Sequence, residues 1–328
     1  MTAAPDNVWL TRGRARFDYF IRQLFDPEEV ESAGQRFQFL LLEILVAVRA
    51  QYELWTWAEI IPNQPAITVP AAIGHYLDVS FMLRDPLYAQ VNALLCGLFM
   101  LLGLTRRLRA GYALAFLSLS VQFAARYGLG KVQHGATMLG MAVLALAVAH
   151  LAFKREDLRR KAALGLLVTM ISVGYIFAGT NKLRATGLRW VRGEHLWLWI
   201  RQKQIDTLSA AGHGKLNFLQ SITLKSSVFA TLQLCFGLLS ELAAVILWWR
   251  PARRWVMLCL AGMHFGISRV MNIHFTPSIL ILLCLALPIA EVFDWLRAKP
   301  AKGTPQAPPS TPEPALPLDP SGAEGRVQ

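Results

Sequence analysis

The stretch that decides the fold is AALGLLVTMISVGYIFAGTNKL, residues 162–183. Its first 20 positions hold no charged side chain, and about 20 apolar residues are the length that a helix needs to cross the hydrocarbon core of a bilayer. The run ends on Asn181 and Lys182, directly after the small-residue step Ala178-Gly179-Thr180. The stretch therefore predicts a transmembrane helix with an amine at one end.

The composition of the whole chain agrees with a membrane protein. Of its 328 residues, 54% are hydrophobic and only 16% are charged, whereas soluble domains carry about 25% charged residues. Apolar blocks alternate with short polar segments, which predicts an all-α fold, a polytopic bundle of seven to eight transmembrane helices. Pro277 and Pro288 predict a bend in the last span. The expected spans are 36–57, 88–104, 111–127, 135–153, 162–183, 226–249, 254–272 and 276–295.

The net charge of +12 resides mainly in the short segments between the apolar blocks, an arrangement that argues against nucleic-acid binding. TRRLRA (105–110), KREDLRRK (154–161) and RPARR (250–254) are all dense in Lys and Arg. Short loops of this kind lie on the cytoplasmic side of a membrane. We therefore expect a multi-pass protein with both termini in the cytoplasm.

Three regions follow from this pattern. Residues 1–35 are expected to form a cytoplasmic, amphipathic N-terminal segment, and residues 36–295 the helical membrane domain. Residues 296–328 are rich in proline, which predicts a disordered cytoplasmic tail. The exterior segment 184–225 interleaves Arg and Lys with Trp. It fits either a belt that binds lipid headgroups or a lid over a polar site or an anionic ligand.

Ionisable side chains inside a bilayer are costly and are functional candidates by default. In the eight-span arrangement, several of them share the outer half of the membrane, which predicts a single outer pocket. Glu241 is expected nearer the cytoplasmic side, paired with another buried polar group rather than in this pocket. The expected pocket residues are His134, Tyr175, Asn181, Lys182, Trp190, His264, Arg269, Asn272 and His274.

Two interpretations fit Lys182 itself. Its long side chain can reach from a helix end to the headgroups. Alternatively, a desolvated lysine beside a small residue such as Ala178 favours the neutral amine, which is a usable base. No HxxxH or CxxC pair is present, and the four cysteines lie in apolar blocks, so we predict neither a metal site nor a disulfide framework.

The segment YIFAGTNKLRATGLRWVRGEHL, residues 175–196, resembles the signature of the horizontally transferred transmembrane domain, which is shared with vitamin K-dependent gamma-carboxylases. Residues 36–295 follow the order of that family. In this chain the insert RATGL lengthens the step from Lys182 to Trp190. The positions that match the signature are Ala178, Gly179, Lys182, Leu183, Trp190 and Gly193.

The resemblance implies a quinol-dependent membrane enzyme. In the family, a buried lysine deprotonates vitamin K hydroquinone, so Lys182 would be the base and His134 would stabilise the oxyanion formed. His264 would be a further pocket residue. The cofactor implied is a vitamin K-like hydroquinone, and the partners are the lipid bilayer and a lipid-soluble small molecule. The residues alone also fit a transporter, an export factor, a lipid-binding scaffold or a partner subunit of another membrane protein.

Overall fold

The computed structural model describes residues 17–19, 21–25, 30–60, 76, 78–83, 85–128, 136–212 and 214–298. Within these ranges the regular structure is entirely helical, which confirms the predicted all-α class. The helices are α2 (Ala33–Ile60), η3 (Ser80–Leu83), α3 (Pro86–Leu104), α4 (Gly111–Gly128), α5 (Thr137–Ala152), α6 (Glu156–Thr186), η5 (Gly187–Val191), α7 (Gly193–Ala211), α8 (Phe218–Lys225), α9 (Ser227–Leu242), η6 (Ala243–Trp248), α10 (Arg250–Met271), α11 (Thr276–Ala286) and α12 (Ile289–Ala298).

Three helical stretches of the described residues are long and apolar enough to cross a membrane: Pro86–Leu104, Glu156–Val191 and Ser227–Trp248. The pair α11 and α12 makes a fourth if its two halves count as one span, bent by 46°. The break falls at Pro288, as predicted, because proline lacks the amide hydrogen that a continuous helix needs. Each expected span contains a helix, and the number that cross the membrane stays a prediction.

The helix ends follow from local sequence. Asp85 caps α3 by accepting from the Leu87 amide, with proline at the first helical position. Gly187 (φ +59°) and Gly212 (φ +70°) end α6 and α7, because a residue without a Cβ adopts the left-handed region at little cost. The segment 184–225, for which the sequence offered a headgroup-binding belt or a lid, contains the end of α6 and the helices η5, α7 and α8.

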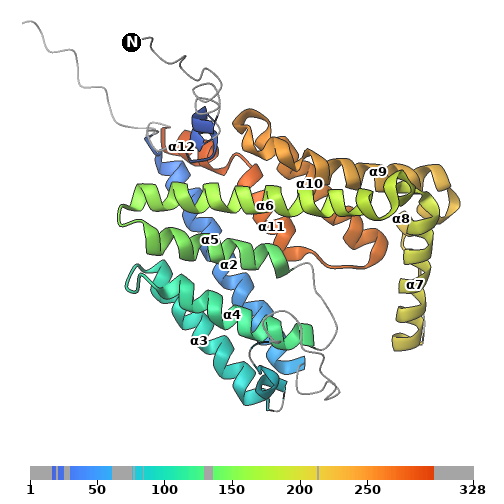
Figure 1. Cartoon of the computed structure of the whole chain (residues 1–328), viewed down its shortest axis with the longest axis horizontal. Coiled ribbons are helices and arrows are strands. Elements are labelled where there is room, and N and C mark those ends of the chain that lie inside the picture. Colours follow the sequence, from blue (N-terminus) through green and yellow to red (C-terminus); the bar gives the residue numbers. More distant parts are fainter. Residues whose placement is uncertain are drawn as a thin grey trace, which may run out of the picture.

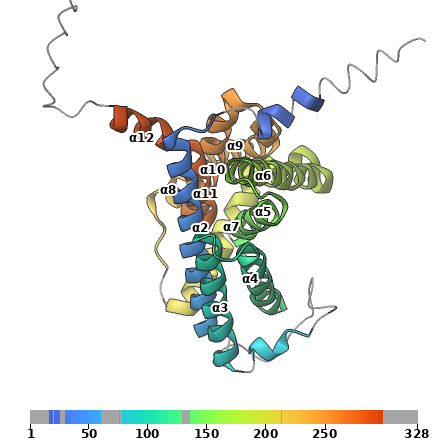
Figure 2. The same cartoon turned by 90° about the vertical axis from the view of Figure 1, so that its left-hand side faces the viewer.

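The helices form an elongated bundle (Figure 1). Helices α6, α9 and α10 run beside one another, while α2, α3 and α4 form the opposite part of the bundle (Figure 1). Helix α7 runs across the end of α6 and α9, at the end of the fold far from α12 (Figure 1). The described N-terminal residues and α12 lie at the same end of the molecule (Figure 2). The α3–α4 and α5–α6 connections lie at one end of the bundle, and α7 and α8 lie at the other (Figure 1).

A saturated polar cluster joins α2 to the α3–α4 connection. Glu43 is fully buried and accepts two hydrogen bonds of 2.7 Å from the Arg106 guanidinium and one of 2.9 Å from the Tyr112 hydroxyl. Burial disfavours the charged Arg106, but its bonds to Glu43 outweigh this and raise the pKa of Arg106. Both carboxylate oxygens of Glu43 have partners, so this cluster is a structural one.

Candidate functional site

The site begins with an ion pair between α6 and α9. The Lys182 ammonium donates a hydrogen bond to Oε1 of Glu241, and the two side chains are 28% and 7% exposed. The same ammonium lies 4.6 Å from the centre of the Trp190 ring, a distance at which a cation is attracted to an aromatic face. The amine is thus turned inward onto a carboxylate and a ring.

Gly179 allows these two helices to approach. A Cβ at Gly179 would lie 3.0 Å from Cδ2 of Leu242 and 3.3 Å from Cβ of Glu241. A larger residue would therefore push α9 away from α6 and weaken the ion pair. Small residues at helix crossings generally allow close helix approach in membrane bundles.

A second polar pair lies two helical turns earlier on α6. The Tyr175 hydroxyl contacts Nε2 of His264 on α10, and the imidazole is 6% exposed. The His264 ring also packs on Phe275, with 4.4 Å between the ring centres. Tyrosine and histidine therefore hold each other in place beside an aromatic wall.

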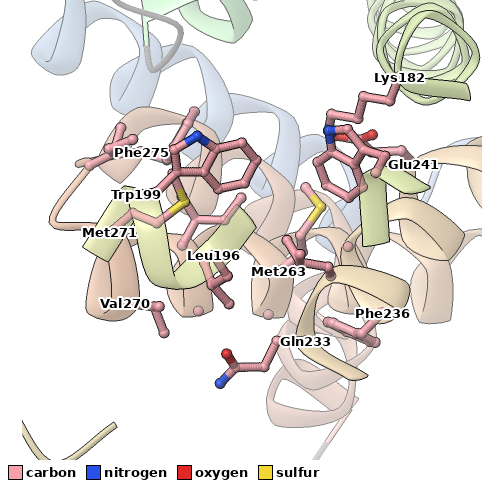
Figure 3. A pocket seen from close by; sticks show the side chains of 17 residues that line it. Lys182, Leu196, Trp199, Gln233, Phe236, Glu241, Met263, Val270, Met271 and Phe275 are labelled. Atoms are coloured by element: carbon pink, nitrogen blue, oxygen red, sulfur yellow. The ribbon is translucent and has the colours of Figure 1, made fainter. Parts of the chain in front are cut away.

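Two cavities adjoin these pairs, with volumes of about 280 and 370 Å³. Ligand pockets in proteins measure roughly 300–1,000 Å³. The smaller cavity continues toward Trp190, Trp199 and Phe236, and the larger one contains Tyr175, His264 and Ala178. Figure 3 shows Lys182 and Glu241 close together on one side of the smaller cavity, with Trp199 and Phe275 across from them. The residues that line both cavities are Lys182, Glu241, Met263, Ile267 and Phe275.

Two buried polar atoms of this site have no hydrogen-bond partner among the described residues: Oε2 of Glu241 and Nδ1 of His264. A buried polar atom without a partner costs roughly 1–3 kcal/mol, so such atoms are rare in a finished core. Both belong to residues that line the larger cavity. The arrangement can offer one carboxylate oxygen and one imidazole nitrogen to a bound molecule.

The structure places the predicted pocket residues in different surroundings. Tyr175, Lys182, Trp190 and His264 line the two cavities. Asn181 lines neither and is exposed, because adjacent residues of a helix point about 100° apart. His134 lies outside the described residues, and its proposed role stays a prediction.

The other three predicted residues line a separate pocket beside α7 and α8. They are Arg269, Asn272 and His274. The expectation of one outer pocket was wrong on this point. Arg269 lies about 140° around α10 from His264, and Asn272 adopts a left-handed conformation (φ 53°) that ends α10 before His274. Beyond this turn the chain no longer follows the helix face that carries His264.

The prediction for Glu241 was half wrong. It is paired, as expected, but its partner is Lys182, so it belongs to the site from which it was excluded. Trp199 and Phe275 were also missed as cavity residues. Trp199 had a signal in the sequence, since it belongs to the Arg- and Trp-rich segment, whereas Phe275 follows a turn that no residue pattern placed.

Comparisons of the chain with protein-family models, with curated proteins and with solved structures gave no match.

Proposed function

We propose that this protein is a multi-pass membrane enzyme that binds a lipid-soluble quinol in the two adjoining cavities and uses Lys182 as a base. The observation that carries the proposal is the Lys182–Glu241 pair, which lines both cavities while Oε2 of Glu241 has no partner in the described structure. By contrast, both oxygens of the buried Glu43 have partners.

The lining suits such a ligand. Apolar and aromatic side chains, among them Trp190, Trp199 and Phe275, make up most of the walls, and they fit the ring and the hydrocarbon part of a quinol. The few polar groups converge at Lys182–Glu241 and at Tyr175–His264. These are positions from which a ring hydroxyl can be held. A bound quinol would supply a ring hydroxyl from which a base can remove a proton.

The ion pair provides a route for the proton. Lys182 would act as a base after passing its proton to Glu241, whose carboxylate it contacts. The amine could then accept a proton from a hydroxyl held beside it, and Tyr175 and His264 would offer polar contacts to the same molecule.

The proposal includes an eight-span arrangement with the ion pair toward the outer side and both termini in the cytoplasm. The basic connections at one end of the bundle and α7 and α8 at the other support it (Figure 1). Single cysteines at Lys154 and Lys203 test the arrangement, since both side chains have solvent access. In intact cells a membrane-impermeant maleimide should label Lys203→Cys, and it should label Lys154→Cys only after permeabilisation. The reverse pattern would invert the topology and remove the charge argument.

Ligand extraction tests the function. The protein is purified in mild detergent, and the organic extract is analysed by mass spectrometry for quinones per chain. We expect a quinone with the wild-type protein and little or none with Lys182→Met. The matched control is Lys225→Met, which removes an exposed lysine that lines neither cavity. Equal quinone content in all three proteins would reject the site, and phospholipid without quinone in the wild type would favour a lipid-binding scaffold.

A further inference from the structure

We propose that the separate pocket beside α7 and α8 binds the anionic phosphate headgroup of a membrane lipid. The pocket has a volume of about 370 Å³ and lies between α7, α8 and the turn that joins α10 to α11. It shares no lining residue with the two cavities of the proposed quinol site. The inference therefore does not depend on the proposed function.

The charge of the pocket selects an anion. Lys203, Lys215, Arg269 and His274 line it, and among the described residues no Asp or Glu does. Lys203 is already paired with Asp206 at 2.8 Å. Among the residues that the structure describes, Lys215 and Arg269 have no ion-pair partner, so two positive charges are available to a ligand. A guanidinium and an ammonium are the groups that proteins most often use for phosphate.

The base of the pocket is held by neutral groups. The Asn217 amide donates to the Arg269 carbonyl at 2.6 Å, and the Gln220 amide donates to the Val270 carbonyl at 2.9 Å. These bonds tie α8 to the last turn of α10, and they position the Arg269 backbone. The amides are consequently part of the frame, and the charged side chains remain for the ligand.

Two further features supply hydrogen-bond donors. The Ser268 hydroxyl lines the pocket, is buried and has no partner in the described part of the chain. Helix α11 begins at Thr276 on the same pocket, and no side chain caps its first turn. The positive end of a helix adds to the attraction for an anion. A hydroxyl, a helix start and two free cations match the oxygen atoms of a phosphate.

The apolar side of the pocket points to a lipid rather than a soluble phosphate. Phe265 on α10 and Ile279 on α11 line this side, and both belong to stretches expected within the membrane. Phe265 is 59% exposed, which is unfavourable in water but suits contact with acyl chains. The pocket thus combines a cationic end with an apolar wall, as an amphiphile requires.

Native mass spectrometry of the full chain tests the proposal. The protein is reconstituted with vesicles of phosphatidylcholine containing phosphatidylglycerol, and the lipids that remain bound in the gas phase are counted. We expect retained phosphatidylglycerol on the wild type and about tenfold less on the double variant Lys215→Gln/Arg269→Gln, because charge-assisted hydrogen bonds are stronger than neutral ones. Arg201→Gln is the matched control, since Arg201 is an exposed cation of α7 that does not line the pocket.

Three results would overturn the proposal. Equal retention by the double variant and the wild type would exclude the pocket as the lipid site. Equal retention of phosphatidylcholine and phosphatidylglycerol would exclude selection of an anionic headgroup. Displacement of the lipid by millimolar inorganic phosphate would identify a soluble anion as the ligand. Thermal unfolding checks that each variant is folded. If the double variant is not folded, the single variant Lys215→Gln replaces it in the lipid measurement, because Lys215 is exposed and has no ion-pair partner among the described residues. Lys182→Met should keep its phosphatidylglycerol, which separates this site from the quinol site.

Discussion

The Lys182–Glu241 pair makes a prediction about stability that differs from its prediction about function. Three variants decide it: Lys182→Met, Glu241→Leu and the double variant. Each single variant removes one charge of the pair, whereas the double variant replaces both with apolar groups of similar length. A buried ion pair is costly to break from one side but is often replaced by apolar residues with little loss.

The magnitudes follow from the exposure of the two partners. Lys182→Met leaves a carboxylate that is only 7% exposed, and an unpaired buried charge costs about 3 kcal/mol or more. Glu241→Leu leaves an ammonium that is 28% exposed and still lies over the Trp190 ring, so we expect a smaller loss of about 1–2 kcal/mol. The double variant should lie within about 1 kcal/mol of the wild type, which gives a coupling energy of about 3–5 kcal/mol.

Reversible unfolding by dodecyl sulfate in mixed micelles, followed by tryptophan fluorescence, measures these free energies. The quinone content of the same four proteins is then measured by extraction. If the pair works on a ligand, the double variant is stable but empty. If the double variant lost as much stability as the two single variants together, the two charges would not interact. A double variant that retained its quinone would remove the pair from the proposed mechanism.

The fold supports further predictions. Glu43→Gln should lower the free energy of unfolding by about 3 kcal/mol, because it breaks a buried, fully paired cluster, and the same change at exposed Glu156 should cost less than about 0.5 kcal/mol; dodecyl sulfate titration compares them, and equal losses would contradict the structural role. Gly111→Ala should cost about 1–3 kcal/mol, because the new Cβ would lie 2.6 Å from backbone atoms of α3. A Cβ at Gly140 meets nothing within 4 Å, so Gly140→Ala should stabilise its helix by up to about 1 kcal/mol. Thermal unfolding compares the two variants, and a more stable Gly111→Ala than Gly140→Ala would refute the packing. Tyr175→Phe should reduce bound quinone about fivefold or more in the extraction assay while costing roughly 1 kcal/mol of stability, the net contribution of one hydrogen bond; unchanged quinone content would place the phenol outside the site.

The helices were predictable from the sequence because long apolar runs leave few alternatives. The range 162–183 lies within α6, and Pro288 in the range 276–295 marks the break between α11 and α12. The segment 184–225 was harder, since its charges and tryptophans carry no strong helical pattern. Its helices depend on local devices such as the capping box between Asn217 and Gln220, which composition does not reveal.

The depth of Glu241 was mispredicted for a physical reason. Counting along each span assumes that all spans begin at one plane. Helix α9 begins at Ser227 and reaches Glu241 only near its end, whereas Lys182 lies within the last turns of α6. The two meet because α9 begins beyond the end of α6, and because Gly179 lets the helices touch. Such a longitudinal offset is set by packing and is not written in either helix alone.

The contrast between two buried glutamates separates structural chemistry from functional chemistry in this bundle. Glu43 has a guanidinium on both oxygens and a phenol besides, and such full satisfaction fixes a bundle without leaving anything for a ligand. Glu241 has one lysine, one oxygen without a described partner, and a cavity on each side. Folding alone gains nothing from leaving that oxygen unpaired. The unpaired oxygen of Glu241 is accounted for if a polar group of a bound molecule donates a hydrogen bond to it. For this reason Lys182, at the end of α6, is better explained by the proposed binding site than by contact with headgroups.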